Sequence, residues 1–453
     1  MTDVLGLVAY LLLPVIGLVT WRLDFVRTMP LPARLAVALA AGALTIGLLL
    51  SALSLIGIEW SRTVLYPILA ILVAIGVLSA RNTPPVPRNP QHATRAFALI
   101  ATAVCWLLAL YGTLTARVSC GDLQFTWGPK AVRFFRAGGL DPAVLHTWPL
   151  TPDYPPLQTL LLAFSNMLPH QFPWWAAILA FPLFFLATLA IIRTWSGDDI
   201  GTLLVAATLA YAFTLSYPAG CAEPPLLLFE TIAIAALVFV DHPRAQTFLV
   251  ALGLAGAVFT KLEGTTFAIA VFLTILLVQR NGKRAFIVIA PAALLFVAWM
   301  TFVLRNDLLT MYGGARMPIY WSVLPVVLKT LAKVAKFDLY WLPYLVPIVL
   351  IAIGNWRRAM MPVTIAVLTS CATVYFYIHY SDPIWWIESS SPRVILTPLL
   401  ALLIGAVAAH APSSSGLQPC ARVARHGLVP EGEETQGSGR PPDPHSGGPV
   451  DQV

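Results

Sequence analysis

The chain has 453 residues, of which 58% are hydrophobic and only 11% are charged. That charged fraction is about half of what a soluble domain carries, so the polar residues are too few to cover a soluble protein of this size. The formal net charge is +7, but the basic residues are scattered between apolar runs and not gathered on a polar domain, which argues against a nucleic-acid partner. The composition therefore predicts an all-α, multi-pass membrane protein.

About 13 apolar runs are long enough, or nearly long enough, to cross a hydrocarbon core of about 30 Å. Their approximate bounds are 4–20, 35–58, 62–80, 97–116, 173–193, 200–217, 225–240, 246–260, 264–279, 284–304, 339–354, 360–379 and 394–410. A further apolar stretch, 155–168, is interpreted as a helix lying at the membrane surface. The 14 tryptophans suit a protein with two water–lipid boundaries, where the indole ring is favoured.

Four short basic loops indicate the orientation. They read "WRLDFVRTMPLPAR", "RNTPPVPRNPQHATR", "QRNGKR" and "NWRR", and the alternation of the spans brings all four to one face. The positive-inside tendency makes that face cytoplasmic in a plasma (inner) membrane. Two longer loops, 117–172 and 305–338, are then outside, facing the periplasm or the exterior. They are basic as well, so a whole-chain count of Lys and Arg does not separate the two sides.

The predicted organisation has four parts. They are additional N-terminal transmembrane helices (1–96), a transmembrane core that contains the first outer loop (97–304), an outer loop with the C-terminal helices (305–410), and a tail (411–453). The tail is rich in Pro, Gly and Ser and has no aromatic residue, which predicts a disordered cytoplasmic segment.

The first outer loop contains the stretch "SCGDLQFTWGPKAVRFFRAGG" (119–139). A proline at the first helical position and two glycines after the last predict a helix between them. On a helical wheel Ala131, Phe134 and Phe135 point one way, and Lys130, Arg133 and Arg136 point roughly the other way. This pattern predicts an amphipathic helix in the membrane interface, whose basic side chains contact either lipid headgroups alone or a ligand.

Further polar side chains are predicted on the same outer side. They are Asp122, His146, Asp153, Tyr154, Glu223, Lys261, Glu263 and Arg393. Some have a simple structural explanation: Asp122 as a turn residue, Glu223 as a solvated loop acid, His146 as a structural histidine. Lys261 and Glu263 fit such an explanation least, because charge at membrane depth is costly and usually functional.

The chemistry that needs this set is sugar transfer from a lipid-linked donor. A polyprenyl tail requires an apolar groove, a phosphate leaving group requires Lys or Arg, and an acceptor hydroxyl requires a carboxylate base. Direct displacement with a single base would invert the anomeric centre.

At these residues the sequence resembles the GT-C superfamily of membrane glycosyltransferases, which includes protein O-mannosyltransferases and lipid A aminoarabinose transferases. The family pattern is an acid in the first outer loop, a proline pair before a juxtamembrane helix, an acid in the next outer loop, and a "TK" turn. The matching positions are Asp122, "DYPPL" (153–157), Glu223 and "TKLEG" (260–264). The resemblance covers about residues 97–304, with a weaker echo at "SSPRVILTP" (390–398), and the "W..KA" spacing at 127–131 is similar to a bacterial subgroup without an assigned substrate.

The resemblance implies roles for individual residues. Asp122 corresponds to the catalytic base and Glu223 to a second active-site acid, whereas Lys130, Lys261 and Arg393 are candidates for contact with the donor phosphate. His146, Asp153, Tyr154 and Glu263 are candidates for contact with substrate or a metal. The implied partners are a polyprenyl-phosphate-linked sugar, membrane lipid, and a glycan, lipid or protein acceptor. Three departures from the family pattern leave the substrate open. The first outer loop reads Asp-Leu where many relatives have Asp-Glu, the second acid is Glu where Asp is common, and three extra spans precede the matching region. They also leave the cofactor open, since a divalent metal is compatible with the sequence but not required by it.

Two rival functions remain. A transporter or lipid flippase would need polar residues along a midplane path, for which Glu230 is nearly the only deep candidate. A non-catalytic membrane scaffold would tolerate substitution of the outer charges.

Cys120 and Cys221 each lie two residues before a candidate acid. If the two acids line one site on an oxidising side, the cysteines are brought near each other and predict a disulfide. The alternative is two unrelated small loop residues.

Overall fold

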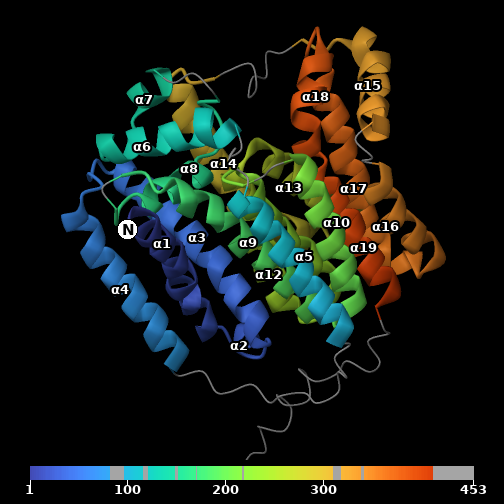
Figure 1. Cartoon of the computed structure of the whole chain (residues 1–453), viewed down its shortest axis with the longest axis horizontal. Coiled ribbons are helices and arrows are strands. Elements are labelled where there is room, and N and C mark those ends of the chain that lie inside the picture. The colour runs from blue at the N-terminus through green and yellow to red at the C-terminus, as the bar shows by residue number, and fades with distance from the viewer. Residues whose placement is uncertain are drawn as a thin grey trace, which may run out of the picture. The chain divides into compact units, whose positions relative to one another are not determined.

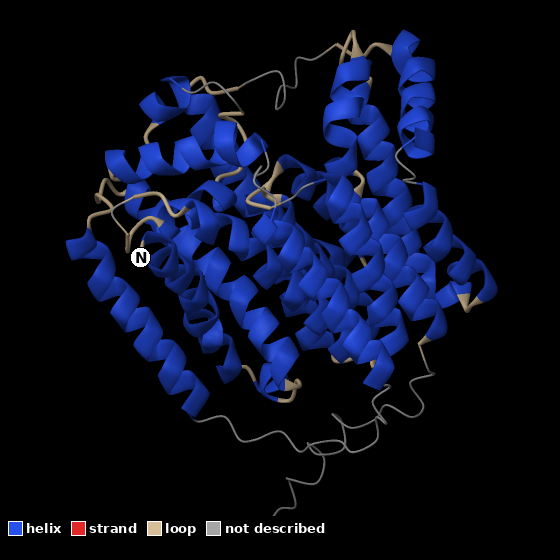
Figure 2. Ribbon diagram, in the orientation of Figure 1, coloured by secondary structure: helices blue, strands red, loops and turns tan. Residues whose placement is uncertain are grey.

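A computed structural model describes residues 1–81, 96–115, 121–147, 151–169, 171–216, 219–309, 318–337 and 341–411. Within these ranges the chain forms helices joined by loops and turns, with no strand (Figure 2). The predicted all-α class is therefore confirmed for the described residues. The predicted tail lies outside them from residue 412 on.

In chain order the helices are α1 (Thr2–Gly17), η1 (Leu18–Arg22), α2 (Asp24–Arg27), α3 (Leu31–Leu55), α4 (Arg62–Arg81), α5 (Ala96–Thr115), η2 (Leu123–Trp127), α6 (Gly128–Ala137), α7 (Pro142–Thr147), α8 (Leu157–Ser165), α9 (Trp174–Ser196), α10 (Asp199–Ser216), α11 (Glu223–Phe239), α12 (Pro243–Thr260), α13 (Leu262–Thr274), η3 (Ile275–Gln279), α14 (Gly282–Arg305), η4 (Trp321–Val323), α15 (Leu324–Phe337), α16 (Trp341–Ile353), α17 (Trp356–Tyr377), α18 (Pro383–Val394) and α19 (Leu396–His410). The short elements η1 and η4 are 3-10 turns, and η2 and η3 are π-helical turns.

Nine helical segments within the described residues are long and apolar enough to cross a membrane. They are α1 with η1, α3, α4, α5, α9, α13 with η3, α14, α17, and α18 with α19. The chain is thus a membrane-embedded protein with several spanning helices. The expected count of 13 is not confirmed, because the runs in α10, α11, α12 and α16 form helices that do not belong to these nine.

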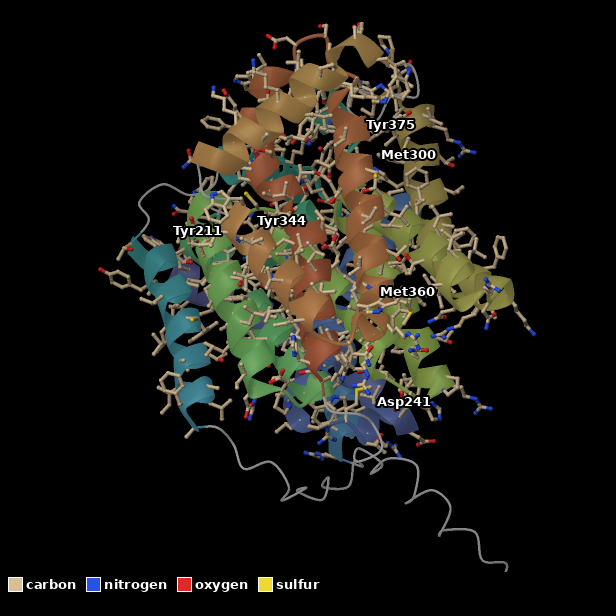
Figure 3. All side chains as sticks on the ribbon, turned by 90° about the vertical axis from the view of Figure 1, so that its right-hand side faces the viewer. Tyr211, Asp241, Met300, Tyr344, Met360 and Tyr375 are labelled. Atoms are coloured by element: carbon tan, nitrogen blue, oxygen red, sulfur yellow. The ribbon has the colours of Figure 1, made fainter. Side chains whose placement is uncertain are left out.

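The loops form two groups, one at each end of the helices, as the predicted alternation of spans requires. Figure 1 places α6 and α7 at the same end as α15 and the first part of α18, whereas α2 lies at the opposite end, where α4 ends and α5 begins. The labelled residues of Figure 3 agree, since Met300 and Tyr375 lie toward the first end and Asp241 and Met360 toward the second. The candidate site residues of the predicted outer loops therefore belong to one end.

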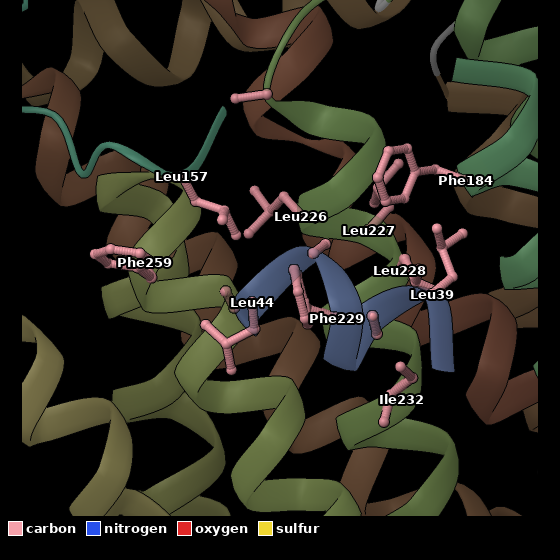
Figure 4. Close-up of a cluster of buried hydrophobic side chains, with 14 of the residues drawn as sticks. Leu39, Leu44, Leu157, Phe184, Leu226, Leu227, Leu228, Phe229, Ile232 and Phe259 are labelled. Carbon is pink, nitrogen blue, oxygen red and sulfur yellow. The ribbon is translucent and has the colours of Figure 1, made fainter. Parts of the chain in front are cut away.

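The helix α11 forms the centre of the core. Every residue from Glu223 to Leu237 is buried, because α9, α12 and α19 pack against it. Apart from Glu223, Glu230 and Thr231 the helix is apolar, as is expected in such a position. Figure 4 shows its side chains against α3 and its neighbours: Leu226, Leu227, Leu228, Phe229 and Ile232 of α11 lie near Leu39, Leu44, Leu157, Phe184 and Phe259.

Two glycines let α12 approach α11 closely. A Cβ at Gly256 would lie 2.1 Å from the ring of Phe229, and one at Gly253 would lie 2.5 Å from the Phe229 carbonyl oxygen. Small residues at a helix interface permit this approach of backbones. The beginning of α11 is thereby held beside the end of α12, which is where the charged residues lie.

The helix α8 lies within the stretch 155–168, for which a location at the membrane surface is predicted. All nine of its residues are buried within the protein, mainly against α3 and α6, and its position relative to a membrane stays a prediction. At about 1.5 Å per residue it is also too short to cross a membrane.

Candidate functional site

The side chains of Asp122 and Arg393 form an ion pair. Asp122 immediately precedes the π-helical turn η2, and Arg393 lies in the last turn of α18. Turns of this kind are rare and occur frequently at functional sites. The ion pair therefore joins the first predicted outer loop to a helix from the far end of the sequence.

A second charged group forms where α12 breaks. Lys261 has an extended backbone between α12 and α13, and its Nζ lies 2.9 Å from Glu223 Oε1 and 2.7 Å from Glu263 Oε1. Glu223 is the first residue of α11, where a negative charge is favoured by the helix dipole. Because the Lys261 side chain is 8% exposed and that of Glu223 is 3% exposed, these charges neutralise one another within the protein.

The two charged groups are neighbours. Arg393 lies in the electrostatic field of Glu223 and Glu263 as well as that of Asp122. The segments that carry Asp122 and Glu223 also pack closely: a Cβ on Gly220, whose φ is +83°, would lie 2.4 Å from a methyl carbon of the Leu123 side chain. We call Asp122, Glu223, Lys261, Glu263 and Arg393 the charged cluster.

The charged cluster retains hydrogen-bonding capacity. The Oε2 atoms of Glu223 and Glu263 are buried and accept no hydrogen bond from any residue that the structure describes. Buried polar atoms are normally satisfied, so each of these two oxygens is available to a donor that enters the site.

Lys130 makes its described hydrogen bonds to Thr151 and not to the charged cluster. Its Nζ donates to the Thr151 carbonyl oxygen at 2.6 Å and to Thr151 Oγ1 at 3.2 Å, and lies 5.7 Å from the centre of the Trp127 ring. Burial lowers the pKa of Lys130 to about 7, although the negative charge of Asp153 opposes this shift. The prediction from the helical wheel, which placed Lys130 on the polar face of α6, is therefore wrong for this residue.

The buried position of Lys130 has a local cause. Lys130 is 2% exposed and lies on the side of α6 that also buries Ala131 and Phe134, because α8 packs there. Arg136, which the wheel placed with Lys130, is exposed as expected.

Asp153 and Tyr154 lie in the turn that Lys130 holds. Asp153 is fully buried, and its carbonyl oxygen accepts a hydrogen bond of 2.8 Å from Trp299 Nε1. The Tyr154 ring lies 5.9 Å from that of Trp127. Burial and then the charge of Glu263 raise the pKa of Tyr154 well above its usual value, so its hydroxyl stays protonated beside the charged cluster.

The remaining candidates are placed differently. His146 is exposed on α7, and no described hydrogen bond or ion pair joins it to the charged cluster. Within the described ranges no group of three or more His, Cys, Asp or Glu residues could hold a metal ion. Cys221 is disulfide-bonded, and its predicted partner Cys120 lies outside the described residues, so the pairing itself stays a prediction.

Sequence reasoning missed three polar partners. Thr151 and Trp299 anchor the 151–154 turn, and Thr397 Oγ1 donates to Glu230 Oε1 at 2.8 Å in the interior of the protein. Neutral threonines and tryptophans are common in apolar sequences and do not indicate a site by themselves. Of the three, only Thr397 lies in a stretch that the family resemblance covers, "SSPRVILTP".

The chain matches no protein-family model, no curated protein and no solved structure.

Proposed function

We propose that the protein is an inverting glycosyltransferase of GT-C type. It moves a monosaccharide from a polyprenyl-phosphate donor to an acceptor hydroxyl on the outer face of the plasma membrane. The observation that carries this proposal is the charged cluster, which brings acids and bases from four distant segments to the end of the helices where the predicted outer loops lie.

The proposed step uses both signs of charge. The acceptor oxygen attacks the anomeric carbon while the bond from that carbon to the phosphate oxygen breaks, and Asp122 takes the acceptor proton. Arg393 and Lys261 stabilise the negative charge that develops on the departing polyprenyl phosphate. Glu223 and Glu263 fix the position of Lys261 through the two short contacts that they make with it.

The free acceptor atoms suit a sugar. Hydroxyl groups are hydrogen-bond donors, and the Oε2 atoms of Glu223 and Glu263 are buried acceptors without a described partner. In this proposal Lys130 is not a phosphate contact, because its ammonium group is directed at Thr151. It holds the turn that presents Tyr154 to the site.

The competing function is a transporter or lipid flippase. Glu230, which is fully buried and hydrogen-bonded to Thr397, is the deep polar group that such a protein would use. The two functions make opposite demands on Asp122, since only glycosyl transfer requires a base there.

The test compares a strain that lacks the protein with strains that carry the wild type, Asp122→Asn or Asp141→Asn. Lipid-linked sugars and envelope glycans are measured by mass spectrometry. Loss of a general base costs about 10²–10⁴-fold in rate, so Asp122→Asn should lose the glycan and accumulate the donor while being expressed normally. Asp141→Asn is the matched control, because the hydrogen bond described for the Asp141 side chain is the one that Oδ1 accepts from the Ala143 N–H at 2.9 Å, and an asparagine can do the same.

Near-normal glycan in the Asp122→Asn strain would overturn the catalytic assignment. A deletion strain whose glycans and lipid-linked sugars are unchanged, but whose lipid distribution between leaflets is altered, would favour the flippase.

The orientation has its own test. Ala143 is exposed on α7, which lies at the same end as α6 (Figure 1), and Asp241 is exposed at the opposite end (Figure 3). Each is replaced by cysteine in turn. An impermeant thiol reagent on intact cells should label position 143, whereas position 241 should react only after permeabilisation. The reverse pattern would place the charged cluster on the cytoplasmic side and end the outer-face proposal.

A further inference from the structure

The ion pair between Asp122 and Arg393 occupies the carboxylate that the proposed reaction needs. An oxygen of Asp122 accepts a hydrogen bond from the Arg393 guanidinium. While that contact lasts, the same oxygen lone pair cannot receive the proton of an acceptor hydroxyl. One of the two oxygens of the base is therefore engaged in the ion pair in the state that the structure describes.

This ion pair is also the more accessible of the two charged groups. The Asp122 side chain is 34% exposed and that of Arg393 is 19% exposed, whereas the values around Lys261 are 8% for Lys261, 3% for Glu223 and 23% for Glu263. A ligand can reach Arg393 without first separating the buried group around Lys261. Lys261 is moreover shared between two carboxylates, so Arg393 is the cation that is easier to recruit.

A guanidinium group binds a carboxylate and a phosphate with the same forked geometry. Asp122 and the phosphate of the donor are thus alternative partners for one side chain. The carboxylates around Arg393 make the competition sharper, because Glu223 and Glu263 already lie in its electrostatic field. An added phosphate is accommodated best if a carboxylate moves away.

We propose that Arg393 exchanges partners during the reaction. It holds Asp122 in the empty site, turns to the phosphate when the polyprenyl-phosphate donor binds, and so frees Asp122 to accept the proton. This inference rests on the proposed glycosyl transfer. After transfer, Asp122, whose side chain is 34% exposed, passes its proton to solvent water, competes again for Arg393, and displaces the polyprenyl phosphate product.

The exchange predicts that the catalytic base weakens phosphate binding. Binding of polyprenyl phosphate to the purified full chain in detergent is measured for the wild type and for Asp122→Asn. The asparagine does not compete for Arg393, so affinity should rise about 5-fold or more, the lower end of typical coupling between two binding events. Polyprenol, which lacks the phosphate, should bind both proteins equally.

The matched control is Glu388→Gln. Glu388 lies on α18 like Arg393, is 47% exposed, and pairs at 3.4 Å with Lys333. Its substitution removes one negative charge from the same helix without touching Arg393, so it should change the affinity little. Arg393→Ala should weaken phosphate binding, and in the Arg393→Ala background Asp122→Asn should bring no gain. Arg393→Lys serves if the alanine variant does not fold.

Equal affinity of the Asp122→Asn and Glu388→Gln proteins would overturn the exchange, as would unchanged binding by Arg393→Ala. If Asp122→Asn is inactive in transfer but no tighter for polyprenyl phosphate, the exchange fails and the proposed function stands. If Asp122→Asn transfers sugar normally, the proposed function fails, and the exchange fails with it.

Discussion

The helices α5 and α11 have similar apolar sequences and opposite surroundings. Of the residues of α5 only Ala98 and Thr113 are buried, and large side chains such as Phe97 and Tyr111 are exposed. The helix α11 is buried almost throughout. Hydropathy does not distinguish them, because a lipid tail and a neighbouring helix are equally apolar.

The charged residues do distinguish the two helices. No charged residue occurs in α5, whereas α11 carries Glu223 and Glu230, both fully or nearly fully buried. A buried charge or carboxyl group needs partners, and only a helix surrounded by other helices can supply them. A carboxyl residue within an apolar run therefore marks a central helix.

The largest expected difference between centre and periphery concerns lysines. Lys261→Ala would leave the buried Glu223 and the partly buried Glu263 without their shared cation, and breaking a buried ion pair costs about 3–5 kcal/mol. Lys329→Ala, on the exposed side of α15, should stay within about 0.5 kcal/mol of the wild type. The free energy of unfolding, measured by denaturant titration in detergent, checks both values. Equal losses for the two variants would contradict the buried cluster.

A smaller difference is expected between two glycines. Gly256→Ala on α12 places a methyl group 2.1 Å from the Phe229 ring and should destabilise by about 1–3 kcal/mol. Gly112→Ala on α5 meets nothing within 4 Å, so the higher helix propensity of alanine makes it neutral or stabilising by up to about 1 kcal/mol. The same titration measures both, and a destabilised Gly112→Ala protein would show that α5 is packed against a partner.

The third expected effect is a pH dependence, which is spread over several pH units. The pKa of Lys130 is about 7 in the folded chain and 10.5 in an ordinary setting, so between these values the unfolded chain binds more protons. Stability should therefore rise with pH across that window, by at most about 1.4 kcal/mol per pH unit. Thermal midpoints at pH 7 and pH 9 measure the rise, which Lys130→Met should reduce and Lys329→Met should leave in place. A rise of the same size in the Lys130→Met protein would assign the pH dependence to another group.

The sequence by itself determined the membrane class and most helix positions. The runs predicted at 62–80 and 97–116 became α4 and α5 with ends shifted by one residue. Apolar runs are a local property of the chain, so they can be read without knowledge of neighbours. Charged residues can be recognised in the same local way, because they stand out in an apolar sequence. That is how the candidate residues Asp122, Glu223, Lys261, Glu263 and Arg393 were found.

Only the tertiary structure decided which of these charges meet. Asp122 and Arg393 are separated by 271 positions, and no local pattern relates them. Lys130 was misplaced for the same reason, since a helical wheel shows which residues share a face but not which face the next helix covers. The partners Thr151 and Trp299 were invisible in advance because a neutral side chain becomes functional only through what packs against it. Local hydropathy fixes where helices form, and long-range packing fixes which buried polar groups find one another.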